Sequence, residues 1–169
     1  MKKLTTPRLV LRGPRIEDVD DLFAVYGDPK VMRYWSNPAH PDRDTTETML
    51  KRHIRASEPI LTYFVIEKDG RAIGCGGVHE GDELGYILGA AYWGQGLMTE
   101  ALQAMIPYFF DELRYPQLTA DADPRNAASV ATLEKVGFVQ TGEAKNTFCV
   151  NGEWSDSVYF TLTPDQPDA

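Results

Sequence analysis

One short stretch constrains the fold more than any other. A strand-like segment at residues 83–88 runs into a loop that holds Gly94-Gln95-Gly96, and helical apolar spacing follows at once. Glycine lets a backbone turn tightly and approach a ligand, and a helix start offers unpaired N–H groups and a partial positive charge. The stretch therefore predicts an anion site suited to a phosphate or pyrophosphate, although a tight turn alone would also explain a lone Gly-x-Gly.

Two nucleotide-binding motifs are excluded for this loop. A P-loop would end in Gly-Lys-Ser/Thr, which is missing after Gly96. A dinucleotide fingerprint would need a third glycine and a parallel sheet, whereas the strands expected before the loop form an antiparallel meander. The anion site must therefore belong to another kind of fold.

The remaining pattern indicates a single α+β domain, 1–169, on a mixed sheet flanked by helices. Pro107 should kink the fourth helix or end it early, and Asp44 with Glu47 resembles a capping box. Asp69-Gly70 and Asn151-Gly152 predict hairpin turns, and 164–169 should be a loose tail. Strands are expected at residues 8–12, 61–68, 71–79, 83–88, 118–123, 138–141 and 158–162, and helices at 17–26, 28–35, 44–56, 94–113 and 127–136.

Composition excludes several classes of protein. The 169 residues include 17 basic and 25 acidic side chains, so the net charge of −8 argues against general nucleic-acid binding. No apolar run approaches the roughly 20 residues of a membrane span, and no hydrophobic stretch follows Met1-Lys2-Lys3, so we expect a cytoplasmic protein.

Cysteine and histidine add no metal or nucleophile chemistry. The two cysteines, Cys75 and Cys149, are too few for a disulfide framework, and the three histidines show no metal-ligand spacing with them, so no metal is expected. Cys75 and His79 would lie about 13 Å apart on a regular strand, which excludes a catalytic dyad.

Three spaced motifs carry a resemblance to a known family. Tyr92-Trp93-Gly94-Gln95-Gly96-Leu97-Met98-Thr99-Glu100-Ala101 resembles the pyrophosphate loop of the GNAT N-acetyltransferase superfamily. Asn126-Ala127-Ala128-Ser129 and Leu133-Glu134-Lys135-Val136-Gly137-Phe138 resemble its second signature. The opening Thr6-Pro7-Arg8-Leu9-Val10-Leu11-Arg12, followed by Glu17-Asp18 and Asp28-Pro29, is similar to the RimJ/RimL-like branch, named for acetyltransferases of ribosomal-protein N-termini.

The resemblance implies a GNAT fold, a mixed, mostly antiparallel sheet splayed between its fourth and fifth strands, with acetyl-CoA in the splay. Asn126 would bond the pantetheine arm, and it also suits a helix N-cap. Met98 and Trp93 depart from the commonest superfamily loop, although Trp93 is familiar in the narrower branch. The other donor contacts would be backbone groups of Ile87 and Leu88 toward pantetheine, and Gly94, Gln95, Gly96, Leu97, Met98 and Thr99 around the pyrophosphate.

The same resemblance implies direct attack of an amine on the acetyl thioester. Leu133 stands where many GNAT enzymes have a tyrosine that acts as an acid toward the CoA sulfur. We therefore expect Ser129 to form a hydrogen bond with that sulfur. The alternative is that the Ser129 hydroxyl only bonds the backbone of its own helix. A backbone N–H of the fourth strand would polarise the thioester carbonyl. Glu83 is the first candidate for the general base and His79 is the second. The alternative is that Glu83 is an ordinary exposed glutamate and that His79 has a structural role. Tyr34 and Trp35 would border the acceptor pocket or serve the core.

The sequence therefore predicts an acetyl-CoA-dependent N-acetyltransferase. The acceptor is a primary amine, either a protein N-terminal α-amine or a small amine, because fold and donor site do not fix it. An acyl-CoA-binding module without significant catalysis is the alternative. A homodimer through strands near the C-terminus stays open.

Overall fold

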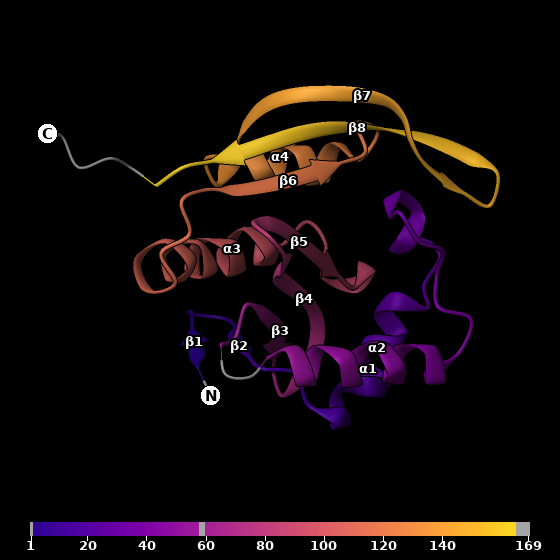
Figure 1. The fold of residues 1–169 in the computed structure, drawn as a ribbon. Helices are drawn as coiled ribbons and strands as arrows, with labels where there is room; N and C mark the ends of the chain where they lie inside the picture. Colours follow the sequence, from indigo (N-terminus) through magenta and orange to yellow (C-terminus); the bar gives the residue numbers. More distant parts are fainter. Residues whose placement is uncertain (1, 58–59, 165–169) are drawn as a thin grey trace, which may run out of the picture.

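The computed structural model describes residues 2–57 and 60–164, and its centre is an eight-stranded mixed sheet in the order β1-β2-β3-β4-β5-β6-β8-β7 (Figure 1). Every neighbouring pair is antiparallel except β5 and β6, which are parallel. The expected α+β fold on a mixed, mostly antiparallel sheet is confirmed. The strands are β1 (Lys3–Thr5), β2 (Val10–Arg12), β3 (Tyr63–Lys68), β4 (Arg71–Glu80), β5 (Glu83–Leu88), β6 (Leu118–Ala122), β7 (Val139–Val150) and β8 (Glu153–Leu162).

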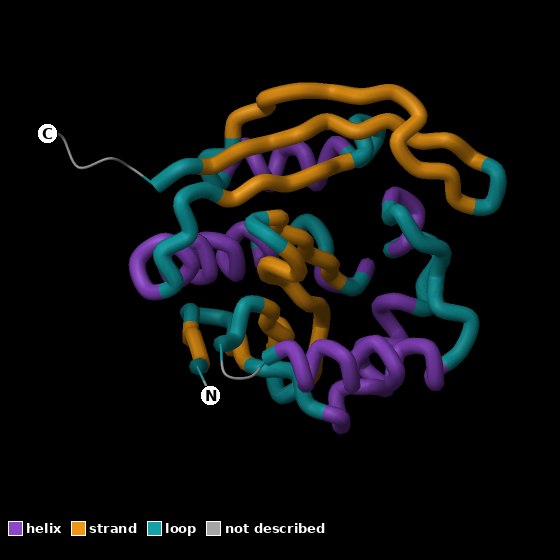
Figure 2. The backbone as a smooth tube through the Cα atoms, in the orientation of Figure 1, coloured by secondary structure: helices purple, strands orange, loops and turns teal. Residues whose placement is uncertain are grey.

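Helices cover both faces of the sheet and bury two apolar clusters. One cluster joins α1 and α2 to one face through residues such as Leu22, Leu50 and Val65. The other joins α3 and α4 to the opposite face and to β6 and β8, through residues such as Phe109 and Phe160. The helices are α1 (Val19–Tyr26), α2 (Arg43–Ala56), α3 (Leu97–Pro107) and α4 (Ala127–Lys135), with 3₁₀ turns at Ile16–Asp18, Met32–Tyr34 and Ala90–Tyr92 and a π-helical turn at Tyr108–Glu112 (Figures 1 and 2). Among the described residues, no helix is both long and apolar enough to cross a membrane.

The sheet splays between β5 and β6. These strands pair at one position only, Glu83 with Thr119, and Asp82 closes that end. The Asp82 carboxylate accepts hydrogen bonds from Thr119 Oγ1 at 2.9 Å and Gln117 Nε2 at 2.8 Å, and its carbonyl accepts from Thr119 N–H at 2.9 Å. Because this single pairing lies at the start of both parallel strands, the gap between them opens toward their carboxyl ends. The expected splay between the fourth and fifth strands is confirmed, since β1 shifts the numbering by one.

Local chemistry explains the turns and the end of α3. Asp69-Gly70 and Asn151-Gly152 have positive φ at both residues, as a tight hairpin turn requires, and both predicted turns are confirmed. The α-helical hydrogen bonding ends at Pro107 because proline has no N–H to donate. A π-helical turn follows, and Leu113 N–H bonds the Tyr108 carbonyl, so Phe109 still reaches the core.

Several element predictions were wrong. Helix α2 is capped by Asp42, not Asp44, because Asp42 has the extended backbone of an N-cap and its carboxylate accepts from Thr45 N–H. Residues 28–35 form only the 3₁₀ turn Met32–Tyr34, and strand β1 was not expected. Strands β7 and β8 are much longer than 138–141 and 158–162, because their pairing continues to the Asn151-Gly152 turn. The tail expected at 164–169 lies, beyond residue 164, outside the described residues.

Candidate active site at the splay

A cavity of about 600 Å³ fills the open side of the splay. Its walls come from β5, the loop before α3, the start of α4 and the 3₁₀ turn Met32–Tyr34. Its charged lining residues are all basic: Lys30, Arg33 and Arg125. In a chain of net charge −8, a cavity whose charged lining residues are all basic suits a polyanionic ligand.

The glycine loop lies at one end of this cavity. Gly94 and Gly96 have φ of 70° and 71°, which glycine adopts without strain, and Gly96 is the N-cap of α3. Leu97, Met98 and Thr99 follow and line the cavity, so the start of α3, which has unpaired N–H groups, lies at its wall. Gln95 does not line the cavity: its side chain bonds the Ala91 carbonyl at 3.1 Å. The loop and the helix start expected to bind an anion lie at this cavity, and the contact expected from the Gln95 backbone N–H stays a prediction.

The backbone of β5 forms the neighbouring wall through Ile87 and Leu88. In an antiparallel ladder, successive residues face alternate neighbours. Gly89 N–H bonds the Ile73 carbonyl at 2.9 Å, so Ile87 directs its backbone groups toward β4 and Leu88 directs them toward the open side. The Leu88 carbonyl already accepts from Trp93 Nε1 at 2.7 Å, which leaves the Leu88 N–H for a ligand. This geometry favours Leu88 over Ile87.

A second cavity of about 150 Å³ adjoins the first and has the opposite charge. Its charged lining residues are all acidic: Glu83, Asp121, Asp123 and Asp156. Burial raises the pKa of Glu83, and nearby carboxylates, Asp121 first, raise it further. Burial also raises the pKa of Asp121, against a hydrogen bond from Ser157 Oγ at 2.9 Å. A carboxylate with a raised pKa accepts a proton more readily, which suits a general base.

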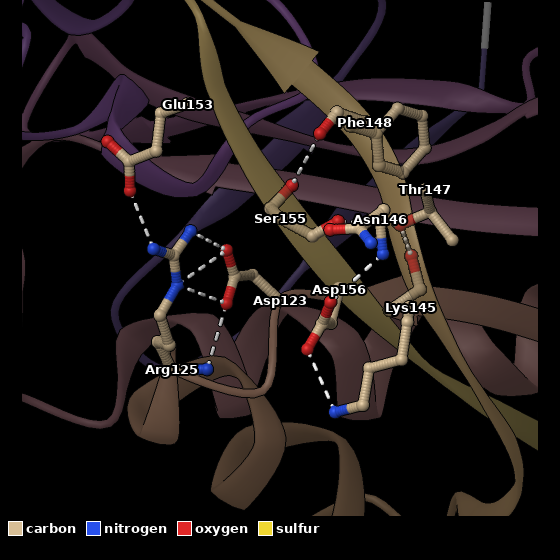
Figure 3. Close-up of polar contacts among 10 residues, drawn as sticks. Asp123, Arg125, Lys145, Asn146, Thr147, Phe148, Glu153, Ser155 and Asp156 are labelled. Carbon is tan, nitrogen blue, oxygen red and sulfur yellow. Dashed lines mark hydrogen bonds and ion pairs between the residues drawn. The ribbon is translucent and has the colours of Figure 1, made fainter.

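Two of the four carboxylates in the smaller cavity have basic partners, as Figure 3 shows. Arg125 pairs with Asp123 at 2.6 Å and with Glu153 near the hairpin turn at 2.6 Å, and its guanidinium lies 5.8 Å from the centre of the Tyr34 ring. Lys145 pairs with Asp156 at 2.9 Å. Among the described residues, Glu83 and Asp121 have no such ion pair. These two carry the unneutralised charge.

Five residues line both cavities and form their shared wall: Tyr34, Trp35, Tyr86, Asn126 and Ser129. Four of them were expected at the site from the sequence. Asn126 also caps α4, because its side-chain oxygen accepts from Ser129 N–H at 3.2 Å. Trp35 also packs edge-on against Tyr26 in the core. The two cavities therefore adjoin at these side chains, and groups bound in the two cavities would approach each other there.

Tyr86 is the member of the shared wall that sequence reasoning missed. Its hydroxyl lies 2.9 Å from Ser129 Oγ and donates to the Ser129 carbonyl at 3.1 Å, and burial raises its pKa to about 12. Leu133, on α4, is buried and lines only the smaller cavity. A phenol therefore reaches Ser129 from β5, where the resemblance led us to look for one on the helix.

Two further residues were missed. Asp121 interrupts an apolar strand with a carboxylate, a pattern that could have marked it as functional. Arg125 precedes the Asn126 cap and pairs with Asp123, two residues before it, but only the folded hairpin brings its second partner, Glu153, close.

His79 lines neither cavity. Its ring packs 4.0 Å from Tyr63 and 4.9 Å from His53, centre to centre. This position gives no support to His79 as the base. Cys75 is buried, and burial raises the pKa of its thiol to about 12, so it is an unreactive core residue. In the described ranges, no three acidic, cysteine or histidine side chains gather as metal ligands would.

Comparisons with known proteins agree with this arrangement. The family model "Acetyltransferase (GNAT) domain" matches residues 8–139. The chain is 30% identical over 172 residues to the uncharacterized N-acetyltransferase p20 of Bacillus licheniformis, covering 96% of each chain. It is 27% identical over 162 residues to spermidine N(1)-acetyltransferase of Escherichia coli K12, covering 92% of this chain and 86% of the relative.

Among solved structures, the fold is similar to RimL, a ribosomal L7/L12 alpha-N-protein acetyltransferase in complex with coenzyme A. The TM-score is 0.85 at 17% identity, and the match covers 97% of this chain and 99% of the other.

Proposed function

The chain belongs to the GNAT acetyltransferase family, and we propose that it moves the acetyl group of acetyl-CoA to a primary amine in a ternary complex. One observation carries the proposal. A basic cavity and an acidic cavity meet at a wall of five shared residues, so an anionic donor and a cationic acceptor would meet there. A binding module without catalysis would need only the basic cavity.

The donor side suits acetyl-CoA in charge and shape. The pyrophosphate would accept hydrogen bonds from the N–H groups of Gly96, Leu97, Met98 and Thr99, at the positive end of α3. The Leu88 N–H would bond the pantetheine arm or polarise the thioester carbonyl. RimL, of similar fold, is in complex with coenzyme A, which agrees with this assignment.

The acceptor enters through the smaller cavity as an ammonium ion and must lose a proton before it can attack. Glu83 or Asp121 would take that proton, through water, because β5 rises about 3.3 Å per residue and separates Glu83 from Tyr86 by about 10 Å. The amine nitrogen then attacks the thioester carbonyl carbon, and the C–S bond breaks. Positioning of the two substrates supplies most of the catalysis.

The leaving thiolate needs stabilisation more than a strong acid, because a thiol has a pKa of about 8.5. When the donor binds, the hydroxyls of Ser129 and Tyr86 would turn from their present partners and donate hydrogen bonds to the sulfur. With its pKa raised to about 12, Tyr86 stays protonated and acts as a hydrogen-bond donor. The proton that ends on the sulfur comes from the attacking nitrogen.

The two carboxylates of the smaller cavity that have no ion pair, Glu83 and Asp121, favour an acceptor with more than one positive charge. A relative is named for spermidine, and RimL is named for a protein N-terminus. We therefore place a small cationic amine first and a basic peptide N-terminus second. An acetylation assay with spermidine and with a basic peptide, each with a free and a blocked amine, separates the two.

The decisive experiment is calorimetric titration of acetyl-CoA into the protein. We expect micromolar binding, about −8 kcal/mol. Gly94→Val should abolish it, whereas Gly70→Val should not. The two glycines are matched, since both have positive φ and nothing near a built Cβ, but only Gly94 lines the cavity. A folded protein that does not bind acetyl-CoA would end the proposal, and binding without thiol release for any cationic amine would favour the binding module.

A further inference from the structure

The opening motif around Arg8 has no part in the function proposed so far, yet its side chains contact the glycine loop. Arg8 donates from Nη1 to the Gln95 carbonyl at 2.9 Å and from Nε to the Glu100 carboxylate at 2.6 Å. Thr6 Oγ1 donates to the same carboxylate at 2.6 Å, and the Arg8 N–H does so at 3.0 Å. The N-terminal segment therefore binds both the glycine loop and the first turn of α3 through hydrogen bonds.

Glu100 poses an electrostatic problem for an anion-binding helix start. It lies three residues after Leu97, less than one turn into α3, and its side chain is only 17% exposed. A carboxylate near a helix N-terminus competes with another anion for the same partial positive charge, and it repels that anion. The guanidinium of Arg8 neutralises this carboxylate.

Arg8 also holds the loop itself. The Gln95 carbonyl that it bonds lies between the two glycines, whose freedom would otherwise let the loop adopt other conformations. The Arg8 Nη2 atom lies 3.7 Å from the position that a Cβ would take on Gly96, so the guanidinium packs directly behind the helix start. One side chain thus fixes the loop backbone and cancels the nearby charge.

We infer that Arg8 is a positioning residue for the pyrophosphate half of the donor, which it serves by holding the Gln95 carbonyl and neutralising Glu100. This inference rests on the proposed function, because it assumes that the donor is acetyl-CoA. It predicts an effect confined to donors that carry a pyrophosphate. S-acetyl-pantetheine has the same thioester and arm without the pyrophosphate, so it serves as the comparison donor.

The test measures KM and kcat for both donors in Arg8→Ala, Glu100→Gln, the double variant and Lys2→Ala. Lys2→Ala is the control, because Lys2 pairs with Glu112 at 2.7 Å, beyond α3, and does not contact the loop. We expect Arg8→Ala to raise the KM for acetyl-CoA about tenfold, the size of one charged hydrogen bond, with kcat and the KM for S-acetyl-pantetheine unchanged.

Glu100→Gln should lower the KM for acetyl-CoA at low salt, because the repelling charge is gone and that of Arg8 is free. In the double variant, the KM for acetyl-CoA should lie between those of the wild type and Arg8→Ala. It still lacks the hydrogen bond from Arg8 to the Gln95 carbonyl, but the repelling charge of Glu100 is also gone. A merely structural role predicts the opposite: both single variants would weaken both donors alike. That result, or an unchanged Arg8→Ala, would overturn the inference.

Two further arms keep the test decisive. If Arg8→Ala does not fold, Arg8→Lys replaces it, because lysine keeps the charge but lacks the fork that reaches both partners. Arg8→Lys should raise the KM for acetyl-CoA by less than tenfold and leave the KM for S-acetyl-pantetheine unchanged. An equal rise in KM for both donors would overturn the inference. A wild-type protein that fails to bind acetyl-CoA would refute the proposed function itself, whereas wild-type binding with an unaffected Arg8→Ala would refute only the role of Arg8.

Discussion

Burial of His53 should make the protein sensitive to acid between pH 7 and pH 5. The side chain lies on α2 and is 7% exposed, stacked 4.5 Å from the Tyr63 ring and 4.9 Å from that of His79. Burial, together with charge repulsion from His79 and Arg52, lowers the pKa of His53 from 6.5 to about 4. The folded protein therefore holds this imidazole neutral.

The size of the effect follows from the two pKa values. Above pH 6.5, His53 is neutral in both the folded and the unfolded chain, so its contribution to stability is fully present. As the pH falls from 6.5 toward 4, only the unfolded chain binds the proton, and the free energy of unfolding decreases. With 1.36 kcal/mol for each pKa unit, the loss is about 2 kcal/mol at pH 5 and about 3 kcal/mol once the pH is below 4.

The assay is urea unfolding of the wild type and of His53→Phe at pH 7 and pH 5. Phenylalanine keeps an aromatic ring against Tyr63 but cannot bind a proton. Other titrating groups, including His79, whose pKa burial also lowers, are common to both proteins and cancel in the comparison. Between pH 7 and pH 5, the free energy of unfolding of the wild type should fall by about 2 kcal/mol more than that of His53→Phe. An equal loss in both proteins would show that His53 is not held neutral and would refute the reasoning.

Three further predictions concern the site. In a thiol-release assay, Tyr86→Phe should lower kcat about tenfold, which is the value of one hydrogen bond to a charged atom, and should leave the KM for acetyl-CoA unchanged. An unchanged kcat would show that the Tyr86 hydroxyl has no part in the mechanism. A base acts when deprotonated, so activity should rise with pH through a pKa above the ordinary value of that carboxylate, 4.5 for Glu83 or 3.8 for Asp121. One of Glu83→Gln and Asp121→Asn should lose this limb of the pH–rate profile, and a limb kept by both variants would exclude both residues as the base. Asn126→Ala should lower the free energy of unfolding by about 1 kcal/mol through the lost cap, and no change in urea unfolding would argue against that cap.

Features set by neighbouring residues were predictable from the sequence. Gly70 and Gly152 adopt positive φ because glycine has no Cβ, and Asp69 and Asn151 before them are residue types that tolerate it. Pro107 ends α-helical bonding because it has no N–H to donate. The glycine loop is equally local, since Gly94 and Gly96 set the backbone at the start of α3. These short-range rules predicted the turn and the helix start at which we propose that the donor binds.

Features that join distant parts of the chain were not predictable in this way. Tyr86 and Ser129 are 43 residues apart, and Thr6 and Glu100 are 94 apart, so no spacing rule pairs them. Asp42 and Asp44 are both good caps, and the extended backbone at Asp42 decided between them. The length of β7 was also hidden, because its mostly exposed residues show no apolar alternation.

The single pairing between β5 and β6 would make the stability of the protein depend on its supply of donor. In the part of the chain that the structure describes, the two halves of the sheet are joined at Glu83 and Thr119 and then separate. A donor lying along the gap would bridge them as an added strand does. Ligand at a hundred times its Kd adds about 2.7 kcal/mol to the free energy of unfolding. Abundant acetyl-CoA would thus protect the enzyme from proteases, and starvation for the donor would expose it to turnover.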